Sequence, residues 1–287
     1  MCVCKDNDGR YADLHLHTNA SDGTYGPSEL VEAAAKLGFS AIAIADHDTV
    51  IGLDEAIERG KTIGLEVIPA VELSTNLDAL EIHILGYFID HHHPGLLEKL
   101  LFFRQYRQNR AEFIVVKLQK LGVAVDVDEF LQEYPNESGK SVGRLHVAQH
   151  LLSKGAISNI AEAFSRYLGP GKPAYASKCN LSPREACQLI REAGGIPVLA
   201  HPQHLRRDEL LPELVKAGIK GLEAYYNNTP EVVIDHYRAL ARELGILVTG
   251  GSDCHQDNKD QFLLGTIKLP YRYVEEMKQH LLNTPAG

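Results

Sequence analysis

Short apolar runs alternate with amphipathic stretches over most of this chain, and this rhythm constrains the fold more than any other feature. The apolar runs predict strands at residues 11–16, 41–45, 65–72, 196–200, 221–224 and 246–249. The amphipathic stretches predict helices at residues 27–38, 50–64, 183–193, 208–217 and 231–244. Repeated strand–helix units form parallel sheets that helices cover. The 287 residues suffice for one α/β barrel, which commonly needs about 250.

The rhythm breaks in the middle of the chain, where the pattern predicts helices without strands between them. A long helix is expected to end at residue 121, and two further helices are expected at residues 142–153 and 158–168. A turn-rich segment follows them. We therefore predict a barrel built from residues 1–95 and 177–287, interrupted by a helical insertion. We expect this insertion, residues 96–176, to contribute to substrate binding.

Histidines and carboxylates gather where the predicted strands end. Asp13-Leu14-His15-Leu16-His17 closes the first strand, and alternate strand residues point to the same face, so both imidazoles share one side. The same alternation pairs Asp253 with His255 after the last predicted strand. Further members of this set follow other strands: Asp46-His47-Asp48, Glu72, His83 and His201. Carboxyl ends of barrel strands meet at one rim, so the set predicts a polynuclear metal site.

Several nearby residues admit two interpretations. Asp22 precedes Gly23 and suits a turn as well as a metal ligand. Asp48 points away from His47 along the strand and is better placed to orient an imidazole than to bind an ion. Cys254 faces away from its flanking ligands, which favours packing over a thiolate or nucleophile role. The His91-His92-His93 run, beside Pro94-Gly95, favours a solvated loop over a metal site.

Composition limits the partners and the compartment. The formal net charge of −9 disfavours tight nonspecific binding to duplex DNA, where neutralised phosphates supply most of the affinity. Five irregularly spaced cysteines argue against a disulfide framework. No apolar run reaches the roughly 20 residues that span a bilayer, and we find no secretory signal, so we expect no membrane partner and a cytoplasmic protein.

These motifs together resemble the polymerase and histidinol phosphatase (PHP) family of metal-dependent phosphoesterases. The resemblance implies a distorted (β/α)₇ barrel of α/β class with a trinuclear metal site. By this resemblance, one ion is held by His15, His17, Glu72 and Asp253, a second by Glu72, His83 and His201, and a third by Asp22, His47 and His255. Family habit favours Mn²⁺, and imidazole ligands also suit Zn²⁺ or Fe²⁺. Amidohydrolases, which share the His-x-His barrel, usually bridge their ions through a lysine, whereas Glu72 is the better bridge here.

Within the family, residues 141–148 and 167–175 resemble the branch of nucleoside 3',5'-bisphosphate phosphatases and ribonuclease AM-type 5'-to-3' exonucleases. Arg144 and Lys172 are candidates to grip a second phosphate, although a solvated helix face and a loop explain them too. His146 is a candidate to protonate the leaving oxygen or contact substrate. Tyr175 is a candidate to stack on a base.

The resemblance implies an enzyme in which a metal-bound hydroxide attacks a phosphomonoester. We expect it to convert a nucleoside 3',5'-bisphosphate to the 5'-monophosphate plus phosphate. The alternatives are a 5'-to-3' exoribonuclease acting on the 5' end of short RNA, a histidinol-phosphatase-like phosphomonoesterase, and a metal-binding regulatory module without catalysis. No Gly-x-Ser-x-Gly elbow, phosphate-binding P-loop or dinucleotide fingerprint points elsewhere.

Overall fold

The chain forms two compact units. The computed structural model describes residues 2–3, 9–78, 80–135, 140–176, 181–255 and 263–283. One unit comprises residues 1–98 and 180–287, and we call it the barrel unit. The other comprises residues 99–179, and we call it the insertion unit.

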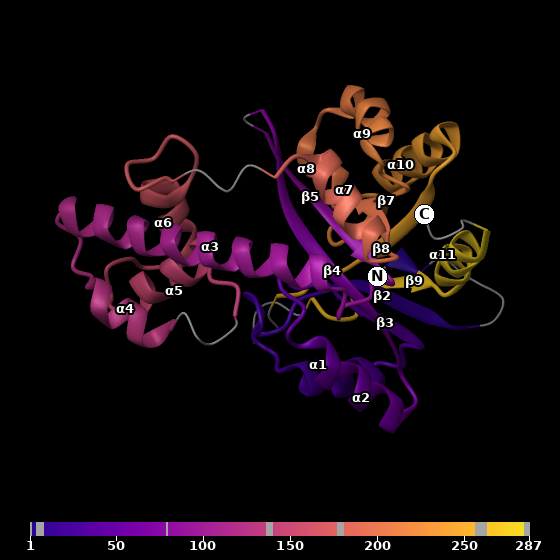
Figure 1. Cartoon of the computed structure of the whole chain (residues 1–287), viewed down its shortest axis with the longest axis horizontal. Helices are drawn as coiled ribbons and strands as arrows, with labels where there is room; N and C mark the ends of the chain where they lie inside the picture. The colour runs from indigo at the N-terminus through magenta and orange to yellow at the C-terminus, as the bar shows by residue number, and fades with distance from the viewer. Residues whose placement is uncertain are drawn as a thin grey trace. The chain divides into compact units, whose positions relative to one another are not determined.

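One mixed sheet forms the centre of the barrel unit (Figure 1). Its strands are β1 (Cys2–Val3), β2 (Tyr11–Leu16), β3 (Ala41–Ile44), β4 (Glu66–Leu77), β5 (Leu80–Tyr87), β6 (Ile196–Leu199), β7 (Gly221–Tyr226), β8 (Leu247–Gly251) and β9 (Ile267–Pro270). They lie in the order β1-β9-β2-β3-β4-β5-β6-β7-β8. The predicted strands all occur, and β9 is an addition that pairs with β2 in antiparallel orientation.

The sheet curls into a nearly closed barrel because β8, the last strand of the order, meets β2, the third strand from the other end. Leu16, at the end of β2, forms a parallel bridge with Cys254, just beyond β8. The His17 amide donates a hydrogen bond of 3.0 Å to the Cys254 carbonyl. A Cβ at Gly251 would overlap His15, so glycine permits this close approach. The α/β barrel predicted from the sequence is thus confirmed.

The prediction of a parallel sheet is wrong for β5. This strand runs antiparallel to β4 and to β6, whereas the pairs β2–β3, β3–β4, β6–β7 and β7–β8 are parallel. β4 ends at Leu77 and β5 begins at Leu80, so the chain has no room for a crossover helix between them. We predicted that the third strand ends at Glu72. Because β4 pairs with β5 in a hairpin, it continues to Leu77, and Glu72 lies inside the strand.

Helices cover the barrel unit. They are α1 (Pro27–Lys36), α2 (Leu53–Ile63), α7 (Pro183–Glu192), α8 (Pro202–Leu205), the short 3₁₀ turn η3 (Asp208–Leu210), α9 (Leu211–Ala217), α10 (Glu231–Leu244) and α11 (Arg272–Asn283). In Figure 1, α1 and α2 lie side by side, and α7 and α10 pack on the β5–β8 part of the sheet. Residues 12–16 of β2 are buried on both faces, as in a sheet covered by helices.

The insertion unit has a core of its own. Its elements are α3 (Pro94–Lys120, whose first turn belongs to the barrel unit), α4 (Val127–Glu133), α5 (Arg144–Ser153), α6 (Ile160–Ala163) and the π-helical turn η2 (Phe164–Leu168). Ile114 and Leu118 of α3, Phe130 of α4 and Leu151 of α5 are buried in one hydrophobic cluster. Within the described residues, no helix of either unit combines the length and the apolar character needed to cross a membrane.

Candidate metal centre

Glu72 is the centre of a buried cluster at the carboxyl ends of the barrel strands. Its side chain is 1 % exposed and lies between imidazoles from four other segments. One carboxylate oxygen, Oε2, lies 3.5 Å from His15, 3.4 Å from His17 and 2.9 Å from His47. The other, Oε1, lies 2.9 Å from His83 and 3.2 Å from His201. The two oxygens thus face different groups of imidazoles.

Two further carboxylates complete the cluster. Asp253 Oδ1 lies 3.4 Å from His15 Nε2 and 3.1 Å from His17 Nε2. Asp22 lies 3.3 Å from His255 Nε2 and 3.9 Å from His47 Nε2. The structure therefore brings together all nine residues that the sequence pointed to as ligands.

Three overlapping groups in this cluster have the spacing of metal sites. In each group the candidate ligand atoms lie within 4.8 Å of one another. The groups are His15, His17 and Asp253; His47, Glu72 and His83; and His17, Asp22, His47 and His255.

Many polar atoms of the cluster approach one another without forming aligned hydrogen bonds. Within the described part of the chain, buried atoms that lack a hydrogen-bond partner include His15 Nε2, both ring nitrogens of His17, Asp22 Oδ1, His47 Nδ1, Glu72 Oε2 and Asp253 Oδ1. Such atoms are costly to bury unless something else satisfies them. Lone pairs that converge in this way fit divalent cations, and mixed imidazole and carboxylate ligands suit transition metals.

The electrostatics of the cluster keep its carboxylates ionised. Burial opposes ionisation of Glu72, but the imidazoles of His47, His83 and His15 hold its pKa well below its usual value. Burial likewise opposes ionisation of Asp253 and Asp22, and neighbouring histidines lower both pKa values. For His47 burial dominates and lowers the pKa to about 4, so its imidazole is neutral and able to bind a metal.

Buried acids around the cluster hold its members in place. Glu223, which is fully buried, lies 3.0 Å from His15 Nδ1 and accepts a hydrogen bond of 2.8 Å from the His201 amide. With its proton on Nδ1, His15 donates to Glu223 and presents Nε2 to the cluster. Asp46 accepts hydrogen bonds from the Thr18 amide and hydroxyl and from the Ser21 hydroxyl. It therefore fixes the loop that carries Asp22.

Asp48 differs from what the pleat of the strand suggested. Its Oδ1 accepts a hydrogen bond of 3.1 Å from the Ser74 amide on β4, so it ties the segment that carries His47 to the neighbouring strand. Asp48, His201 and Asp253 all have left-handed backbone conformations, with φ of 50°, 29° and 52°. Non-glycine residues adopt this region at a cost that other contacts must offset, and such strain concentrates at functional sites.

Sequence reasoning missed two contributors to the cluster. Glu81 Oε1 lies 2.9 Å from His83 Nε2, opposite the nitrogen that faces Glu72. Tyr226 donates a hydrogen bond of 2.8 Å to Asp253 Oδ2. Both carried a signal, because Glu81 shares a strand face with His83 and Tyr226 ends β7 at the same rim.

The predicted substrate residues all lie in the insertion unit, but they differ in their surroundings. The Arg144 guanidinium lies 5.9 Å from the ring centres of both Phe164 and Tyr175. His146 is buried, and its Nδ1 accepts a hydrogen bond of 3.0 Å from the Gly143 amide at the start of α5. Lys172 is exposed in the turn that leads to Tyr175. Their roles toward substrate stay predictions.

The histidine run and Cys254 do not contribute side chains to the cluster. His91 Nε2 and His92 Nε2 lie 2.9 Å and 3.1 Å from Asp54 Oδ1, in a separate exposed group. Cys254 is buried, and its backbone carbonyl accepts the hydrogen bond from the His17 amide.

Fold and site together define an α/β barrel with a buried cluster of histidines and carboxylates that is able to bind metal. The family model of the PHP domain matches residues 13–168 of this sequence. A 3',5'-nucleoside bisphosphate phosphatase of Chromobacterium violaceum is 31% identical over 248 residues, 85% of this chain and 86% of the relative. A 5'-3' exoribonuclease, Rnm, of Escherichia coli is 34% identical over 265 residues, 87% of this chain and 88% of the relative.

A solved structure agrees with these relatives. It is assigned as a metal-dependent phosphoesterase from Bifidobacterium adolescentis, with a TM-score of 0.84 and 30% identity, and the match covers 95% of this chain and 96% of the other. The chain belongs to the PHP domain family. The predicted enzyme class, a phosphoric ester hydrolase, is confirmed by these relatives.

Proposed function

We propose that the cluster around Glu72 holds divalent metal ions and that the chain uses them to hydrolyse a phosphate ester of a small nucleotide. The single observation that carries the proposal is the position of Glu72, whose two oxygens face five imidazoles at distances of 2.9–3.5 Å. A lone buried carboxylate does not need five imidazoles. A carboxylate that bridges cations does, since each ion requires further ligands.

The proposed complement is three ions. Glu72, with His15, His17 and Asp253, would hold one ion, and Glu72, with His83 and His201, would hold a second. Asp22, His47 and His255 would hold the third. We propose Mn²⁺, because the mixture of carboxylates with imidazoles suits it, and Zn²⁺ and Fe²⁺ are the alternatives that metal analysis distinguishes.

When bound, such ions lower the pKa of a water molecule and neutralise the nonbridging oxygens of a phosphoryl group. The residues of the chain supply the rest. Glu223 and Glu81 orient His15 and His83, and Tyr226 orients Asp253. We propose that Arg144, with Lys172, grips a second phosphate and that Tyr175 stacks on the base.

The proposed reaction converts a nucleoside 3',5'-bisphosphate to the nucleoside 5'-monophosphate and phosphate. The name of the Chromobacterium violaceum relative supports this substrate. The second candidate is 5'-to-3' hydrolysis of short RNA, which the name of the Escherichia coli relative supports at similar coverage. Both reactions use a nucleotide with a 5'-phosphate, so one centre can serve both.

A phosphate-release screen tests the proposal. Metal-loaded protein is assayed with adenosine 3',5'-bisphosphate, adenosine 5'-monophosphate, histidinol phosphate and 5'-phosphorylated short RNA, with nucleotide products followed by chromatography. We expect turnover of the bisphosphate or the RNA and none in Asp253→Ala. Absence of hydrolysis with every substrate and metal, or unchanged activity in Asp253→Ala, contradicts the proposal.

Counting the ions needs a separate control. The exposed group of Asp54, His91 and His92 can capture metal and inflate the count. Elemental analysis is therefore performed on the intact protein and on His92→Ala. Three ions per chain in His92→Ala support the proposed complement, and fewer than two contradict it.

A further inference from the structure

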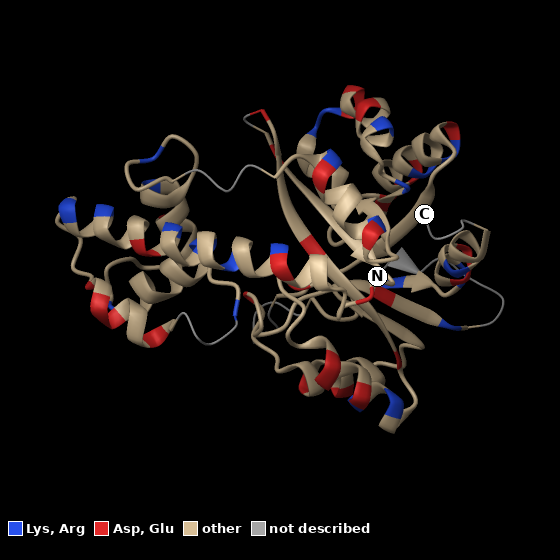
Figure 2. Ribbon diagram, viewed as in Figure 1, with Lys and Arg blue, Asp and Glu red and all other residues tan. Residues whose placement is uncertain are grey.

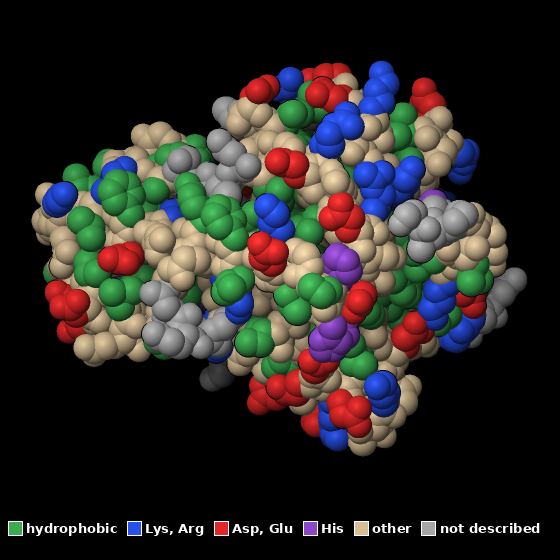
Figure 3. Space-filling model, in the orientation of Figure 1, with side chains coloured by type: hydrophobic (Ala, Val, Ile, Leu, Met, Phe, Trp, Pro, Cys, Tyr) green, Lys and Arg blue, Asp and Glu red, His purple; other side chains and the backbone are tan. Residues whose placement is uncertain are grey.

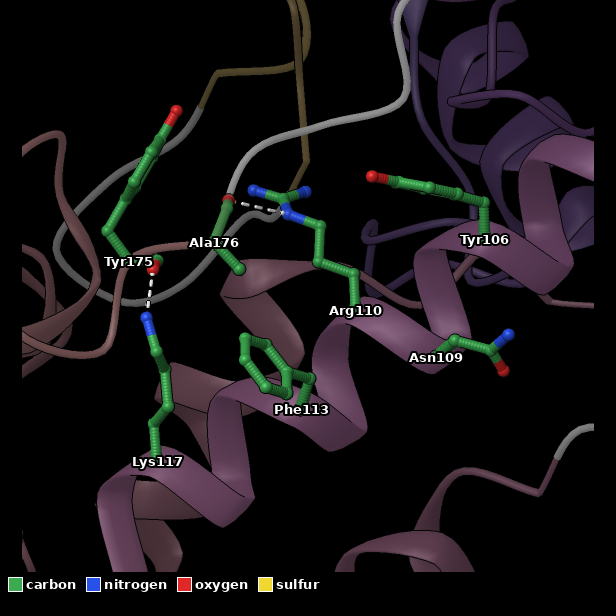
Figure 4. A pocket seen from close by; sticks show the side chains of 7 residues that line it. All are labelled: Tyr106, Asn109, Arg110, Phe113, Lys117, Tyr175 and Ala176. Carbon is green, nitrogen blue, oxygen red and sulfur yellow. Dashed lines mark hydrogen bonds between the residues drawn. The ribbon is translucent and has the colours of Figure 1, made fainter. Parts of the chain in front are cut away.

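The insertion unit contains a cavity of about 490 Å³ that no part of the metal centre explains (Figure 4). One wall is α3, which contributes Tyr106, Arg110, Phe113 and Lys117, and Tyr175 lies on the other wall. We call it the α3 pocket. Its volume falls within the range of about 300–1,000 Å³ that is usual for small-molecule sites.

Aromatic and cationic side chains alternate along the α3 wall. Tyr106, Arg110, Phe113 and Lys117 follow one another at intervals of four, three and four residues, which place them on one face of the helix. In Figure 4 the Phe113 ring lies between the side chains of Arg110 and Lys117. The Lys117 ammonium lies 5.3 Å from the centre of that ring. No carboxylate lines the pocket within the described residues.

Hydrogen bonds fix the opposite wall to α3. Arg110 Nε donates to the Ala176 carbonyl at 3.0 Å, and Lys117 Nζ donates to the Tyr175 carbonyl at 2.6 Å. An ammonium group has three donors, so this bond occupies one of them. Arg144 lies 5.9 Å from the Tyr175 ring centre and adds positive charge beside the same wall.

Charge and exposure indicate the kind of ligand. Residues 99–179 include 12 Lys and Arg and 7 Asp and Glu, whereas the whole chain has a net charge of −9. Figure 2 shows basic positions repeated along α3. Phe113 is 53 % exposed, although burying such a ring would stabilise a fold. An exposed ring between cations suits a flat aromatic group joined to an anion, which is the chemistry of a nucleotide.

We propose that the α3 pocket binds a nucleotide, with its base against Phe113 and Tyr175 and its phosphate near Lys117 and Arg110. The choice of a nucleotide as the ligand rests on the proposed nucleotide hydrolysis, whereas the pocket and its charge do not. That nucleotide is either one unit of a single-stranded RNA or a free nucleoside bisphosphate. The two sources share one chemistry, and the experiment separates them.

The test measures binding without turnover. The probes are a 5'-phosphorylated, fluorescently labelled RNA with hydrolysis-resistant phosphorothioate linkages, followed by anisotropy, and adenosine 3',5'-bisphosphate, followed as a competitor. Phe113→Ala is expected to weaken binding about tenfold, as loss of one stacking ring does. Lys117→Gln is expected to weaken binding and to reduce the salt dependence of RNA affinity by about one phosphate contact.

Matched controls lie on the same helix. Phe102→Ala removes an equally exposed ring that does not line the pocket, and Lys120→Gln removes an exposed charge from the same helix. Both are expected to bind as the unaltered protein does. Thermal melting checks that each variant is folded.

The outcomes are distinct. If the Phe113 and Lys117 variants weaken binding of the RNA but not of the bisphosphate, the pocket holds an RNA nucleotide that follows the 5'-terminal one. If they weaken binding of both probes equally, the pocket holds the 5'-terminal nucleotide. If Phe113→Ala matches Phe102→Ala and Lys117→Gln matches Lys120→Gln with both probes, the pocket is not a nucleotide site. Hydrolysis plays no part in these readings, so a failed screen for phosphate release leaves them intact.

Discussion

The barrel unit gathers buried polar side chains in one cluster, whereas the insertion unit leaves an aromatic ring of the α3 pocket exposed. His15, Glu72 and Glu223 are each no more than 1 % exposed, and His15 lies 3.5 Å from Glu72 and 3.0 Å from Glu223. In the insertion unit, Phe113 is 53 % exposed and the side chains of the α3 pocket are separated by helical spacing. Figure 3 shows hydrophobic side chains on the surface of both units.

The two units also differ in charge. The insertion unit has five more Lys and Arg than Asp and Glu, although the chain as a whole carries −9, so the acidic residues are concentrated in the barrel unit. A metal centre needs fixed ligands in a dry environment, where electrostatic interactions are strong. A nucleotide chain is bound by cationic side chains and aromatic rings, which accept its phosphates and bases in several orientations. This difference supports our proposal that chemistry takes place in the barrel unit and recognition in the insertion unit.

Glu72→Gln tests the chemical half of this comparison and has the largest expected effect. The substitution keeps the shape of the side chain but removes the charge that faces five imidazoles. We expect loss of bound metal and a decrease in kcat/KM of more than about a hundredfold, since even residues that only support a ligand cost ten- to a hundredfold. Elemental analysis and phosphate release measure these effects.

The control for Glu72→Gln is Glu58→Gln, which removes the same charge from the exposed face of α2. It is expected to keep full metal content and activity. A Glu72→Gln protein that retains both would show that the centre of the cluster is elsewhere.

Glu223→Gln tests whether a carboxylate without contact to an ion supports the centre. Glutamine can still accept the hydrogen bond from the His201 amide, but it loses the charge beside His15 Nδ1. We expect metal affinity to fall by about ten- to a hundredfold, as measured by competition with a chelator. Glu213→Gln, an exposed change on α9, serves as the control. Equal affinities in the two variants would limit Glu223 to a packing role.

The sequence predicted the cluster because its signals are local. The alternation of His15 with His17 and of Asp253 with His255 follows from the pleat of a strand, and all four side chains lie in the cluster. The position of Glu72 was harder to predict. Ser74, Thr75 and Asn76 read as the polar end of a strand, yet β5 pairs with them and extends β4 to Leu77.

Other features depend on tertiary structure and leave no local pattern. The left-handed φ of His201 and Asp253 arises where the chain turns at the rim of the barrel. Along α3, the mixture of rings and cations at helical spacing resembles a solvated face in the sequence. The pocket exists only because the return segment brings Tyr175 to this face, where Lys117 holds its carbonyl.

Arg144→Ala tests the recognition half of the comparison. We expect the KM for a nucleoside 3',5'-bisphosphate to rise about tenfold more than the KM for a monophosphate, because a charged hydrogen bond to the second phosphate is lost. Metal content is expected to stay the same, since Arg144 belongs to the insertion unit. Arg166→Ala, which removes a more exposed arginine that lies 5.0 Å from the Tyr167 ring, is the control. Equal increases in KM for both substrates would remove Arg144 from the role of second-phosphate ligand.

Tyr226→Phe has the smallest expected effect and examines how finely the barrel unit positions its ligands. Burial, together with the Asp253 carboxylate, raises the pKa of Tyr226, so its hydroxyl stays protonated and donates to Asp253 Oδ2. Loss of one such hydrogen bond costs about 1 kcal/mol, so we expect metal affinity to fall about fivefold. Tyr225→Phe is a close control, because it removes the neighbouring hydroxyl, which lies 3.0 Å from the Tyr273 hydroxyl. If both variants lower the melting temperature but only Tyr226→Phe weakens metal binding, the hydroxyl acts through Asp253. If both weaken it equally, general loosening of β7 accounts for the change, and the ligands are less finely positioned than the buried cluster suggests.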